Sequence, residues 1–394
     1  MDGSLRLDFP FFNVPNPIAY LDNAATTQKP GSVIERVSTS MSFDNANIGR
    51  GSYPLAIRLE SEVEAVRNKV GNYICSDGGQ IIFTKGSTEA LNMVSSSICS
   101  NARKGMNIVV TELEHSSNYY PWMRGCRKAG LELRIVPAEA DGSLKTERVL
   151  EYLDGNTAAV SITGMSNVTG FVPDIEAICS FARAKGILSV IDASQLAAHE
   201  NIDVRKIGSD YLCFSGHKIY GPMGTGVLYA SENGLENLEP LLVGGGAVNP
   251  DGSFLSGAEG FEAGTPNVCG ILGLGSAVDY LIQHDDEIKS TEDRLSSYLY
   301  DSLSEVSGLH IISGRPSVIC SFIMDGLGPY DIGVILGQRG IAIRTGACCA
   351  YPLMKRLGRE GVCRVSLSFY NTKEEIDLLA FVLRGIGLRY GGRT

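Results

Sequence analysis

Two residues in the middle of the chain, Lys218 and Asp192, have the types and spacing of a cofactor site. Lys218 follows an apolar run over residues 211–214 and stands between a Ser-Gly-His turn and a glycine-rich stretch, and Asp192 ends the preceding apolar run. A lysine buried beside glycines at a strand end can lose its proton and form a Schiff base. An aspartate at a neighbouring strand end can hold a pyridinium nitrogen. The pair indicates pyridoxal phosphate (PLP) chemistry.

Several hydroxyl and imidazole groups near these two residues are candidates for binding a phosphate. Ser87 and Thr88 follow a glycine where a predicted strand gives way to a helix. Backbone N–H groups and the helix dipole at such a point favour an anion, and the two hydroxyls add donors. A plain N-cap that stabilises the helix is the alternative. Ser215 and His217 flank Lys218 and offer further donors, with turn stabilisation as their alternative role.

Two further polar residues, His115 and Asn167, follow predicted strands. An imidazole at position 115 could stack on a pyridine ring and move protons. A lone histidine is more often a structural residue, and an aspartate such as Asp192 is more often a turn or cap residue when taken alone. The assignment of these residues to one site therefore depends on Lys218 and on the sheet that would bring them together.

A second group of reactive residues lies near the C-terminus, in the segment Arg344-Thr-Gly-Ala-Cys-Cys349. A cysteine on a glycine-bearing loop near arginine can have a lowered pKa and act as a nucleophile. Arg364 offers a planar fork that suits a substrate carboxylate. Ordinary loop thiols and an ion-pair arginine are the alternative. Cys348, Cys349 and Cys363 also suggest a metal site, but no nearby histidine completes a usual ligand set, so we expect no metal.

The elements that must position these residues follow a strand–helix alternation. Apolar runs typical of buried strands occupy residues 81–83, 107–111, 158–162, 188–191 and 211–214. Helices are predicted over residues 88–97, 117–129 and 175–185. This alternation predicts an α/β fold in which helices cover both faces of a mostly parallel sheet. Ligands of such sheets bind beyond the carboxyl ends of the strands, which is where the candidate residues fall.

Beyond about residue 282 the pattern changes to that of a smaller α+β unit. Helices are predicted over residues 284–303, 330–339 and 373–388, and strands over 310–312 and 318–323. We expect a large cofactor-binding domain over residues 19–282. We expect a small domain, carrying the cysteine loop, to be formed by residues 1–18 and 283–394. Residues 244–260 are rich in glycine and predict a flexible loop.

Composition narrows the class of protein. The chain of 394 residues has a net charge of −10, 44% hydrophobic residues and 20% charged residues, which is typical of a soluble globular protein. The negative charge argues against a nucleic-acid partner or an anionic membrane surface. No apolar run is long enough to span a bilayer, and the N-terminus lacks a signal-peptide pattern. Ten cysteines without a disulfide rhythm favour a reducing, cytoplasmic location.

The chain resembles the cysteine desulfurases of the class V aminotransferase superfamily (PLP fold-type I), and within them the SufS-like branch. The motifs that carry the resemblance are Ser215-Gly-His-Lys-Ile-Tyr-Gly-Pro222, Phe261-Glu-Ala-Gly-Thr-Pro-Asn267 and Arg344-Thr-Gly-x-x-Cys349. The likeness runs from the segment Tyr20-Leu-Asp-Asn-Ala-Ala-Thr26 to Cys363-Arg-Val-Ser-Leu-Ser-Phe-Tyr-Asn371. It therefore covers nearly the whole chain and implies a large and a small domain of that fold.

The resemblance also implies a role for each candidate residue. Lys218 would be the Schiff-base lysine, Asp192 the partner of the pyridine nitrogen, and His115 the residue stacked on the ring. Gln195 would bond the phenolic oxygen of PLP. The cofactor phosphate would be bound by Ser87, Thr88, Ser215 and His217, joined by Thr265 from the other subunit of a homodimer. Asn167, Arg344 and Arg364 would hold the substrate, and Cys349 would be the nucleophile that accepts sulfur.

The activity implied by the resemblance is the conversion of L-cysteine to L-alanine with a persulfide left on Cys349. The sulfur would pass to an acceptor or scaffold protein, for iron–sulfur cluster assembly or a related pathway. Selenocysteine lyase, cysteine-sulfinate lyase and aminotransferase reactions on the same scaffold are alternatives, although an aminotransferase would not need Cys349. A non-catalytic assembly scaffold is a remote alternative.

The chain departs from this branch at several positions. The two residues before the nucleophile, often both histidine, are Ala347 and Cys348. Gly49 and Tyr53 stand where the branch has histidines, and Gly260 replaces an arginine. These changes concern the surroundings of the substrate and the persulfide rather than the cofactor. Cys348 can compete with its neighbour as the persulfide carrier.

Overall fold

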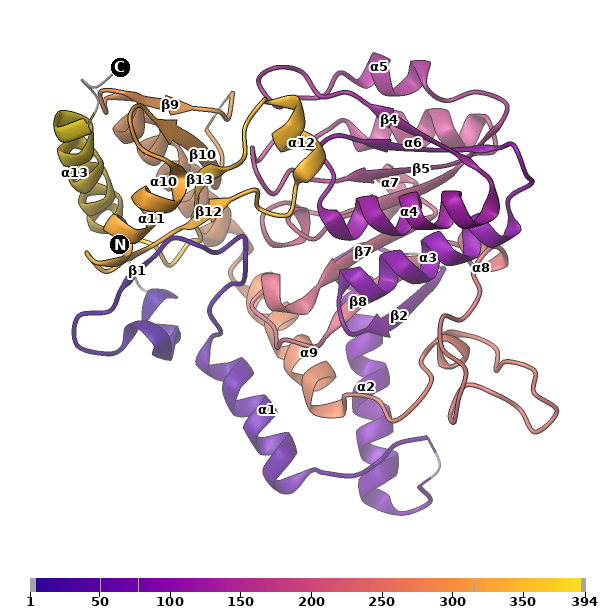
Figure 1. Ribbon diagram of the computed structural model, residues 1–394. Helices are drawn as coiled ribbons and strands as arrows, with labels where there is room; N and C mark the ends of the chain where they lie inside the picture. The colour runs from indigo at the N-terminus through magenta and orange to yellow at the C-terminus, as the bar shows by residue number, and fades with distance from the viewer. Residues whose placement is uncertain (1–4, 50, 77, 315, 391–394) are drawn as a thin grey trace.

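The structure is a computed structural model that describes residues 5–49, 51–76, 78–314 and 316–390. Its main feature is a seven-stranded sheet with the order β2-β8-β7-β6-β5-β3-β4 (Figure 1). The strands are β2 (Gln80–Thr84), β3 (Asn107–Thr111), β4 (Glu132–Val136), β5 (Thr157–Thr163), β6 (Leu188–Asp192), β7 (Tyr211–Ser215) and β8 (Gly226–Ala230). β3 to β7 run parallel, and β8 is antiparallel to both neighbours. The mostly parallel sheet that the sequence predicts is confirmed.

The strands of this sheet are apolar on both faces because helices cover both faces. Ile108 and Val110 of β3 pack into one buried cluster with α3 and α4, whereas Val109 between them packs into a cluster on the opposite face. Such alternation follows from the period of two residues along a strand. The continuous apolar runs of the sequence therefore correspond to strands buried on both sides.

Helices cover both faces of this sheet (Figure 1). One side carries α3 (Ser87–Asn101) and α4 (Ser116–Ala129). The remaining helices of this part of the chain, on either side of the sheet or next to it, are α1 (Gly31–Phe43), α2 (Pro54–Tyr73), α5 (Thr146–Glu151), α6 (Ile175–Ala184), α7 (Val204–Ile207), α8 (Glu232–Glu236) and α9 (Val268–Gln283). Short 3-10 helices are η1 (Leu5–Asp8), η2 (Pro10–Phe12), η3 (Leu196–Ala198), η4 (Gly216–Lys218) and η5 (Ala258–Phe261). The sequence pattern did not identify α1, α2, α9, β4 or β8.

A second, antiparallel sheet has the order β12-β13-β10-β9. It consists of β9 (Leu309–Ile311), β10 (Ile319–Met324), β12 (Arg344–Gly346) and β13 (Val362–Ser366), and it packs with α10 (Asp285–Ser304), α11 (Pro329–Gly337) and α13 (Lys373–Tyr390). The loop after β12 leads into α12 (Tyr351–Arg356), which Figure 1 shows between the two sheets. This connection places the cysteine loop against the large sheet.

The predicted domain boundaries at residues 18/19 and 282/283 stay a prediction. β1 (Ala19–Tyr20) forms a two-stranded parallel sheet with β11 (Ile341–Ala342), so the first residues after position 18 pair with the C-terminal part of the chain. Residues 1–4, 315 and 391–394 of the predicted small domain lie outside the described residues.

The described residues lack the features of two other classes of protein. None of the helices in this part of the chain combines the length and the apolar character that crossing a bilayer requires. The same residues contain no group of three or more histidine, cysteine or acidic side chains arranged to hold a metal ion.

Candidate active site

A pocket of about 340 Å³ brings the two groups of candidate residues together. It lies beyond the carboxyl ends of β5, β6 and β7, where the cysteine loop approaches the large sheet. It is lined by the predicted residues Ser87, Thr88, His115, Asn167, Asp192, Gln195, Ser215, His217, Lys218, Arg344, Cys349 and Arg364, together with Cys348. Segments more than 200 residues apart in the sequence thus form one cavity, and Thr265 is the predicted site residue that does not line it.

Lys218 and Asp192 reach the pocket from adjacent strands. Asp192 is the last residue of β6 and pairs in register with Cys213 of β7, and Lys218 ends the 3-10 turn that follows β7. Burial lowers the pKa of Lys218, and the charge of Asp192 opposes this shift. Asp192 Oδ1 accepts a hydrogen bond of 3.0 Å from the Ser194 N–H. The site therefore combines an oriented carboxylate with a lysine that loses its proton more readily than a lysine in water.

Hydroxyl groups gather at the N-terminus of α3. The Ser87 N–H donates to Ser215 Oγ, and the hydroxyls of these two residues lie 2.9 Å apart. Thr88 Oγ1 lies 2.8 Å from Ser117 Oγ at the start of α4. Burial and the nearby charge of Lys218 lower the pKa of His217 to about 4, so its ring is neutral at physiological pH. This cluster is a suitable environment for a phosphate because two helix N-termini meet several donors.

His115 has a structural role as well as a place in the pocket. It is the N-cap of α4, and its Nδ1 accepts a hydrogen bond of 3.1 Å from the Ser117 N–H. Burial, followed by the charge of Lys218, lowers its pKa to about 4. A neutral ring whose Nδ1 accepts carries its proton on Nε2. The hydrogen-bond donor of His115 is therefore fixed on the nitrogen that does not cap the helix.

The loop that carries Cys348 and Cys349 is held to the large sheet by three hydrogen bonds. Ser116 donates from both its N–H and its Oγ to the Cys349 carbonyl at 2.7 Å, and Asn167 Nδ2 donates to the Cys348 carbonyl at 2.7 Å. Both cysteines have positive φ values, 50° and 55°. Such backbone conformations are unfavourable for residues other than glycine, and persist where the surroundings enforce them. Cys349 is exposed, whereas Cys348 is half-buried and burial raises its pKa.

Arg344 and Arg364 stand directly opposite each other on the antiparallel strands β12 and β13. Both bind Asp22, with Nη2–carboxylate distances of 2.7 Å for Arg344 and 3.1 Å for Arg364. Arg364 Nη1 also donates to the Asn167 carbonyl at 2.9 Å. The buried atoms Arg364 Nε and Asn167 Oδ1 have no protein partner among the described residues. A buried donor and a buried acceptor without partners indicate that this corner of the pocket is shaped for a ligand.

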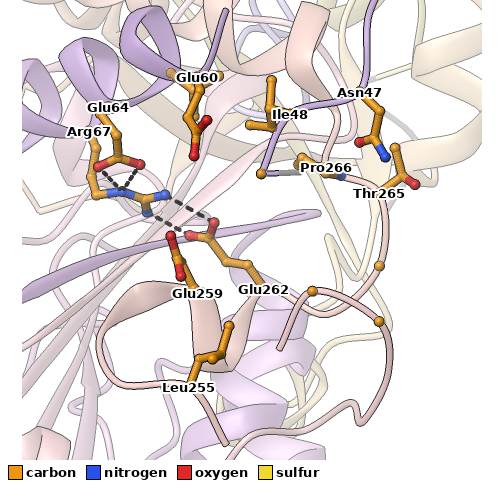
Figure 2. Close-up of a pocket in the computed structure, with 15 residues that line it drawn as sticks. Asn47, Ile48, Glu60, Glu64, Arg67, Leu255, Glu259, Glu262, Thr265 and Pro266 are labelled. Atoms are coloured by element: carbon orange, nitrogen blue, oxygen red, sulfur yellow. Dashed lines mark hydrogen bonds and ion pairs between the residues drawn. The ribbon is translucent and has the colours of Figure 1, made fainter. Parts of the chain in front are cut away.

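The two remaining predicted residues, Gln195 and Thr265, lie at different pockets. Gln195 Nε2 donates to the Ala24 carbonyl at 2.8 Å, at the wall of the Lys218 pocket. Thr265 instead lines a second pocket, which Figure 2 shows between residues 47–49, α2 and the 245–266 segment. There Arg67 forms a double hydrogen bond with Glu262, at 2.6 and 3.0 Å (Figure 2). Within this single chain, Thr265 and the Lys218 pocket are separate.

Two residues at the site were missed by the sequence analysis. Asp22, which bridges the two arginines, was read only as part of a family motif. Glu114 precedes His115 and is fully buried, with Oε1 accepting from Thr111 Oγ1 at 2.7 Å and Oε2 from Asn118 Nδ2 at 2.6 Å. Burial raises the pKa of Glu114 to about 8. The sequence signal that could have identified Glu114 is its position as an acidic residue directly before the candidate histidine His115.

The departures from the family pattern have different structural settings. Gly49 lines the second pocket, Tyr53 is the half-exposed N-cap residue of α2, and Ala347 packs beside Cys348 against the main core. At Gly260 an added Cβ would lie 2.3 Å from the Leu255 carbonyl oxygen. A side chain at position 260 would therefore require the local backbone to shift.

Comparison with known proteins places the chain in a family. The model of the aminotransferase class-V family matches residues 19–379. A cysteine desulfurase of Pectobacterium atrosepticum is 38% identical over 97% of each chain, and one of Dickeya dadantii is 39% identical over 97% of this chain and 96% of the relative. The solved structure of a cysteine desulfurase from Thermococcus onnurineus superposes with a TM-score of 0.92 at 32% identity, covering 98% of both chains. Another, from Escherichia coli, has a TM-score of 0.89 at 33% identity and covers 97% of this chain and 98% of its own. The chain therefore belongs to the aminotransferase class-V family, and it is similar over nearly its whole length to cysteine desulfurases.

Proposed function

We propose that this protein is a PLP-dependent cysteine desulfurase, which converts L-cysteine to L-alanine and takes the sulfur as a persulfide on Cys349. The observation that carries the proposal is the position of the Cys349 loop, which lines the same pocket as Lys218 and Asp192. A lysine with a lowered pKa and an oriented aspartate are the groups that PLP requires. An adjacent thiol on a held loop is the additional group that sulfur removal requires.

The residues present fit PLP. The hydroxyl cluster at the N-terminus of α3 is suited to the phosphate, and Lys218 and Asp192 to the two ends of the ring system. The unpartnered buried atoms Arg364 Nε and Asn167 Oδ1 belong to residues that line the same pocket. They are suited to the carboxylate and the amine of an amino acid. When bound, PLP supplies an electron sink that stabilises negative charge at the substrate α-carbon.

The protein groups have distinct tasks in this reaction. Lys218 would take the proton from the substrate α-carbon, and its lowered pKa suits a general base. Asp192 would hold the proton on the pyridine nitrogen. His115 would stack on the ring with its proton on Nε2, and Gln195 would bond the phenolic oxygen. Gln195 is itself oriented by its bond to the Ala24 carbonyl.

The thiol of Cys349 performs the step that defines the reaction. Its thiolate would attack the sulfur of the bound substrate, so that a sulfur–sulfur bond forms and the bond between that sulfur and the substrate β-carbon breaks. The β-carbon keeps the electron pair of the broken bond and takes up a proton, which gives the methyl group of alanine. Arg344 and Arg364 hold the substrate carboxylate while this occurs. Cys349 is exposed, so the resulting persulfide is accessible to an acceptor protein. We propose that the sulfur serves iron–sulfur cluster assembly or a related pathway.

We further propose that the protein acts as a homodimer in the cytoplasm, with Thr265 completing the phosphate site of the partner subunit. This explains why a residue of the Phe261-Glu-Ala-Gly-Thr265 motif lies outside the Lys218 pocket of its own chain. Large apolar side chains near this second pocket are exposed, among them Phe43 at 80% and Val243 at 73%. Such side chains are typical of a surface covered by another subunit. The ten free cysteines are compatible with a reducing compartment.

The proposal is tested with purified protein reconstituted with PLP. L-Cysteine should yield alanine, and sulfide in the presence of a thiol reductant, with both products lost in Lys218→Ala. Cys349→Ser should lose the sulfide. Alanine and sulfide formation that persists in both variants would refute the assignment. Selenocysteine and cysteine sulfinate are assayed in parallel; preferred turnover of either would identify the corresponding lyase. Transamination without sulfur release would identify an aminotransferase.

A further inference from the structure

The loop after β12 carries two adjacent thiols, and only one of them is used by the proposed reaction. Cys348 lines the same pocket as Cys349, but it is half-buried and packs against the main hydrophobic core, whereas Cys349 is exposed. Its Sγ lies 3.6 Å from the Gly346 carbonyl oxygen. Cys348 is therefore a second thiol in the reaction pocket, adjacent to Cys349 in the chain and more sheltered from solvent.

We propose that Cys348 is a second sulfur carrier, which receives the sulfane sulfur from the Cys349 persulfide and holds it inside the pocket. This inference rests on the proposed function, because the sulfur must first reach Cys349. The Cys348 thiolate attacks the outer sulfur of the Cys349 persulfide. The bond between that sulfur and Cys349 breaks, a new sulfur–sulfur bond forms on Cys348, and Cys349 leaves as a thiolate that takes the proton released by Cys348. No external oxidant or reductant is consumed.

The backbone favours transfer of the outer sulfur over a direct disulfide between the two cysteines. Adjacent Cα atoms are about 3.8 Å apart across a trans peptide, whereas disulfides usually join Cα atoms about 4.4–6.8 Å apart. A direct bond would therefore distort the dipeptide. Transfer of a third sulfur needs no bond between the two Sγ atoms, because that sulfur extends the reach of Cys349 by about 2 Å.

The hydrogen bonds of the loop oppose the same distortion. Asn167 holds the Cys348 carbonyl and Ser116 holds the Cys349 carbonyl with two donors. Both cysteines are thereby kept at positive φ, and a closed disulfide would have to break this arrangement. The loop can instead keep its conformation while the sulfane sulfur moves from one side chain to the next.

Charged groups of both signs lie near Cys348. Burial and the Asp22 carboxylate raise the pKa of the Cys348 thiol, while the guanidinium groups of Arg364 and Arg344 act in the opposite direction, and the net pKa is raised. The same two groups stabilise the negative charge of a persulfide on Cys348. Transfer restores the Cys349 thiolate at the exposed position, so a second molecule of L-cysteine can react before an acceptor arrives. The loop would then store two sulfane sulfurs for each chain.

The test counts alanine and sulfane sulfur in the PLP-loaded enzyme, given excess L-cysteine without reductant or acceptor. The wild-type enzyme should form about two equivalents of alanine per chain in its first burst, and Cys348→Ala about one. Cys75→Ser, which changes another half-buried cysteine outside the pocket, should keep about two. Alkylation followed by peptide mass spectrometry should find one sulfane sulfur on each of Cys348 and Cys349.

Each other outcome contradicts a defined part of the scheme. A single sulfur on Cys349, two sulfurs chained on Cys349, or a Cys348–Cys349 disulfide with sulfide release would each overturn the transfer while leaving the desulfurase proposal intact. A persulfide on Cys348 in the Cys349→Ser variant would overturn the order of transfer. Absence of any persulfide together with absence of alanine would instead refute the proposed function.

Discussion

The two arginines of the pocket should contribute unequally to binding the substrate carboxylate. They occupy facing positions on β12 and β13, but the Arg364 side chain is 4% exposed and the Arg344 side chain 48%. Hydrogen bonds to charged groups contribute about 1.5–3 kcal/mol, and each 1.4 kcal/mol is tenfold in affinity. Because lysine cannot reproduce the fork of arginine, Arg364→Lys should lower kcat/KM for L-cysteine by about 10- to 150-fold. An exposed ion pair contributes about 0.2–1 kcal/mol, so Arg344→Lys should lower it by about fivefold at most.

The assay must separate loss of carboxylate binding from damage to the fold. Initial rates of alanine formation over a range of L-cysteine concentrations give kcat and KM, and the loss should lie mainly in KM. Competitive inhibition by L-alanine and by ethylamine isolates the carboxylate, since the two differ only by that group. Arg364→Lys should weaken inhibition by L-alanine and leave that by ethylamine within about twofold. Thermal unfolding of each variant measures the structural effect separately.

Two results would contradict this reasoning. Equal losses in Arg344→Lys and Arg364→Lys would show that burial does not decide the contribution of each arginine. Equal weakening of L-alanine and ethylamine in Arg364→Lys would show that Arg364 acts through its bonds to Asp22 and to the Asn167 carbonyl rather than through the substrate.

Three further predictions concern pH and packing. Burial raises the pKa of Glu114 to about 8, whereas the unfolded chain loses this proton near pH 4.3. The folded wild type therefore loses stability as pH rises from about 4.3 towards 8. Because glutamine does not ionise, the Tm of Glu114→Gln should rise relative to that of the wild type over this range. Burial lowers the pKa of His199, but the charge and the 2.9 Å hydrogen bond of Glu292 outweigh it and raise the pKa overall. The stability that this pair provides is present below about pH 6.5 and is lost as pH rises, so the Tm deficit of His199→Gln should be larger at pH 6 than at about pH 9. An alanine Cβ at Gly226 would lie 2.4 Å from Gly86 Cα, and relieving this contact should cost about 1–3 kcal/mol. Because Gly86 precedes the hydroxyl cluster, Gly226→Ala should weaken PLP binding by about 5- to 150-fold in an equilibrium titration, and unchanged affinity would count against that location of the phosphate.

The sequence predicts the large sheet and its ligand edge because these depend on local patterns. Fully buried parallel strands are continuous apolar runs, and the polar residues that follow them are visible as interruptions. β8 was missed because Gly226 and the preceding glycines make the segment resemble a loop. α2 was missed although it carries an apolar residue every three or four positions, at Ala56, Leu59, Val63, Val66 and Val70, which was an available signal of a helix.

The contacts that complete the site could not be predicted from local patterns. Asp22 binds Arg344 and Arg364, which lie 322 and 342 positions away in the sequence. These two arginines face each other because β12 pairs with β13, and the apolar pattern of the sequence did not identify either strand. The raised pKa of Glu114 follows from complete burial, which only tertiary packing determines. The capping of α4 by His115 Nδ1 likewise depends on the backbone geometry after β3.

The most direct test of the central claim is a single-turnover experiment on the PLP-loaded protein, in which alanine and the persulfide on Cys349 are measured together. With L-cysteine below the enzyme concentration and no reductant, we expect one persulfide for each alanine, first detected on Cys349. The Cys349→Ser variant should bind PLP, as judged by its visible absorption, and should form no persulfide. Equal yields of alanine and sulfide in Cys349→Ser and in the wild type would contradict the claim that Cys349 accepts the sulfur.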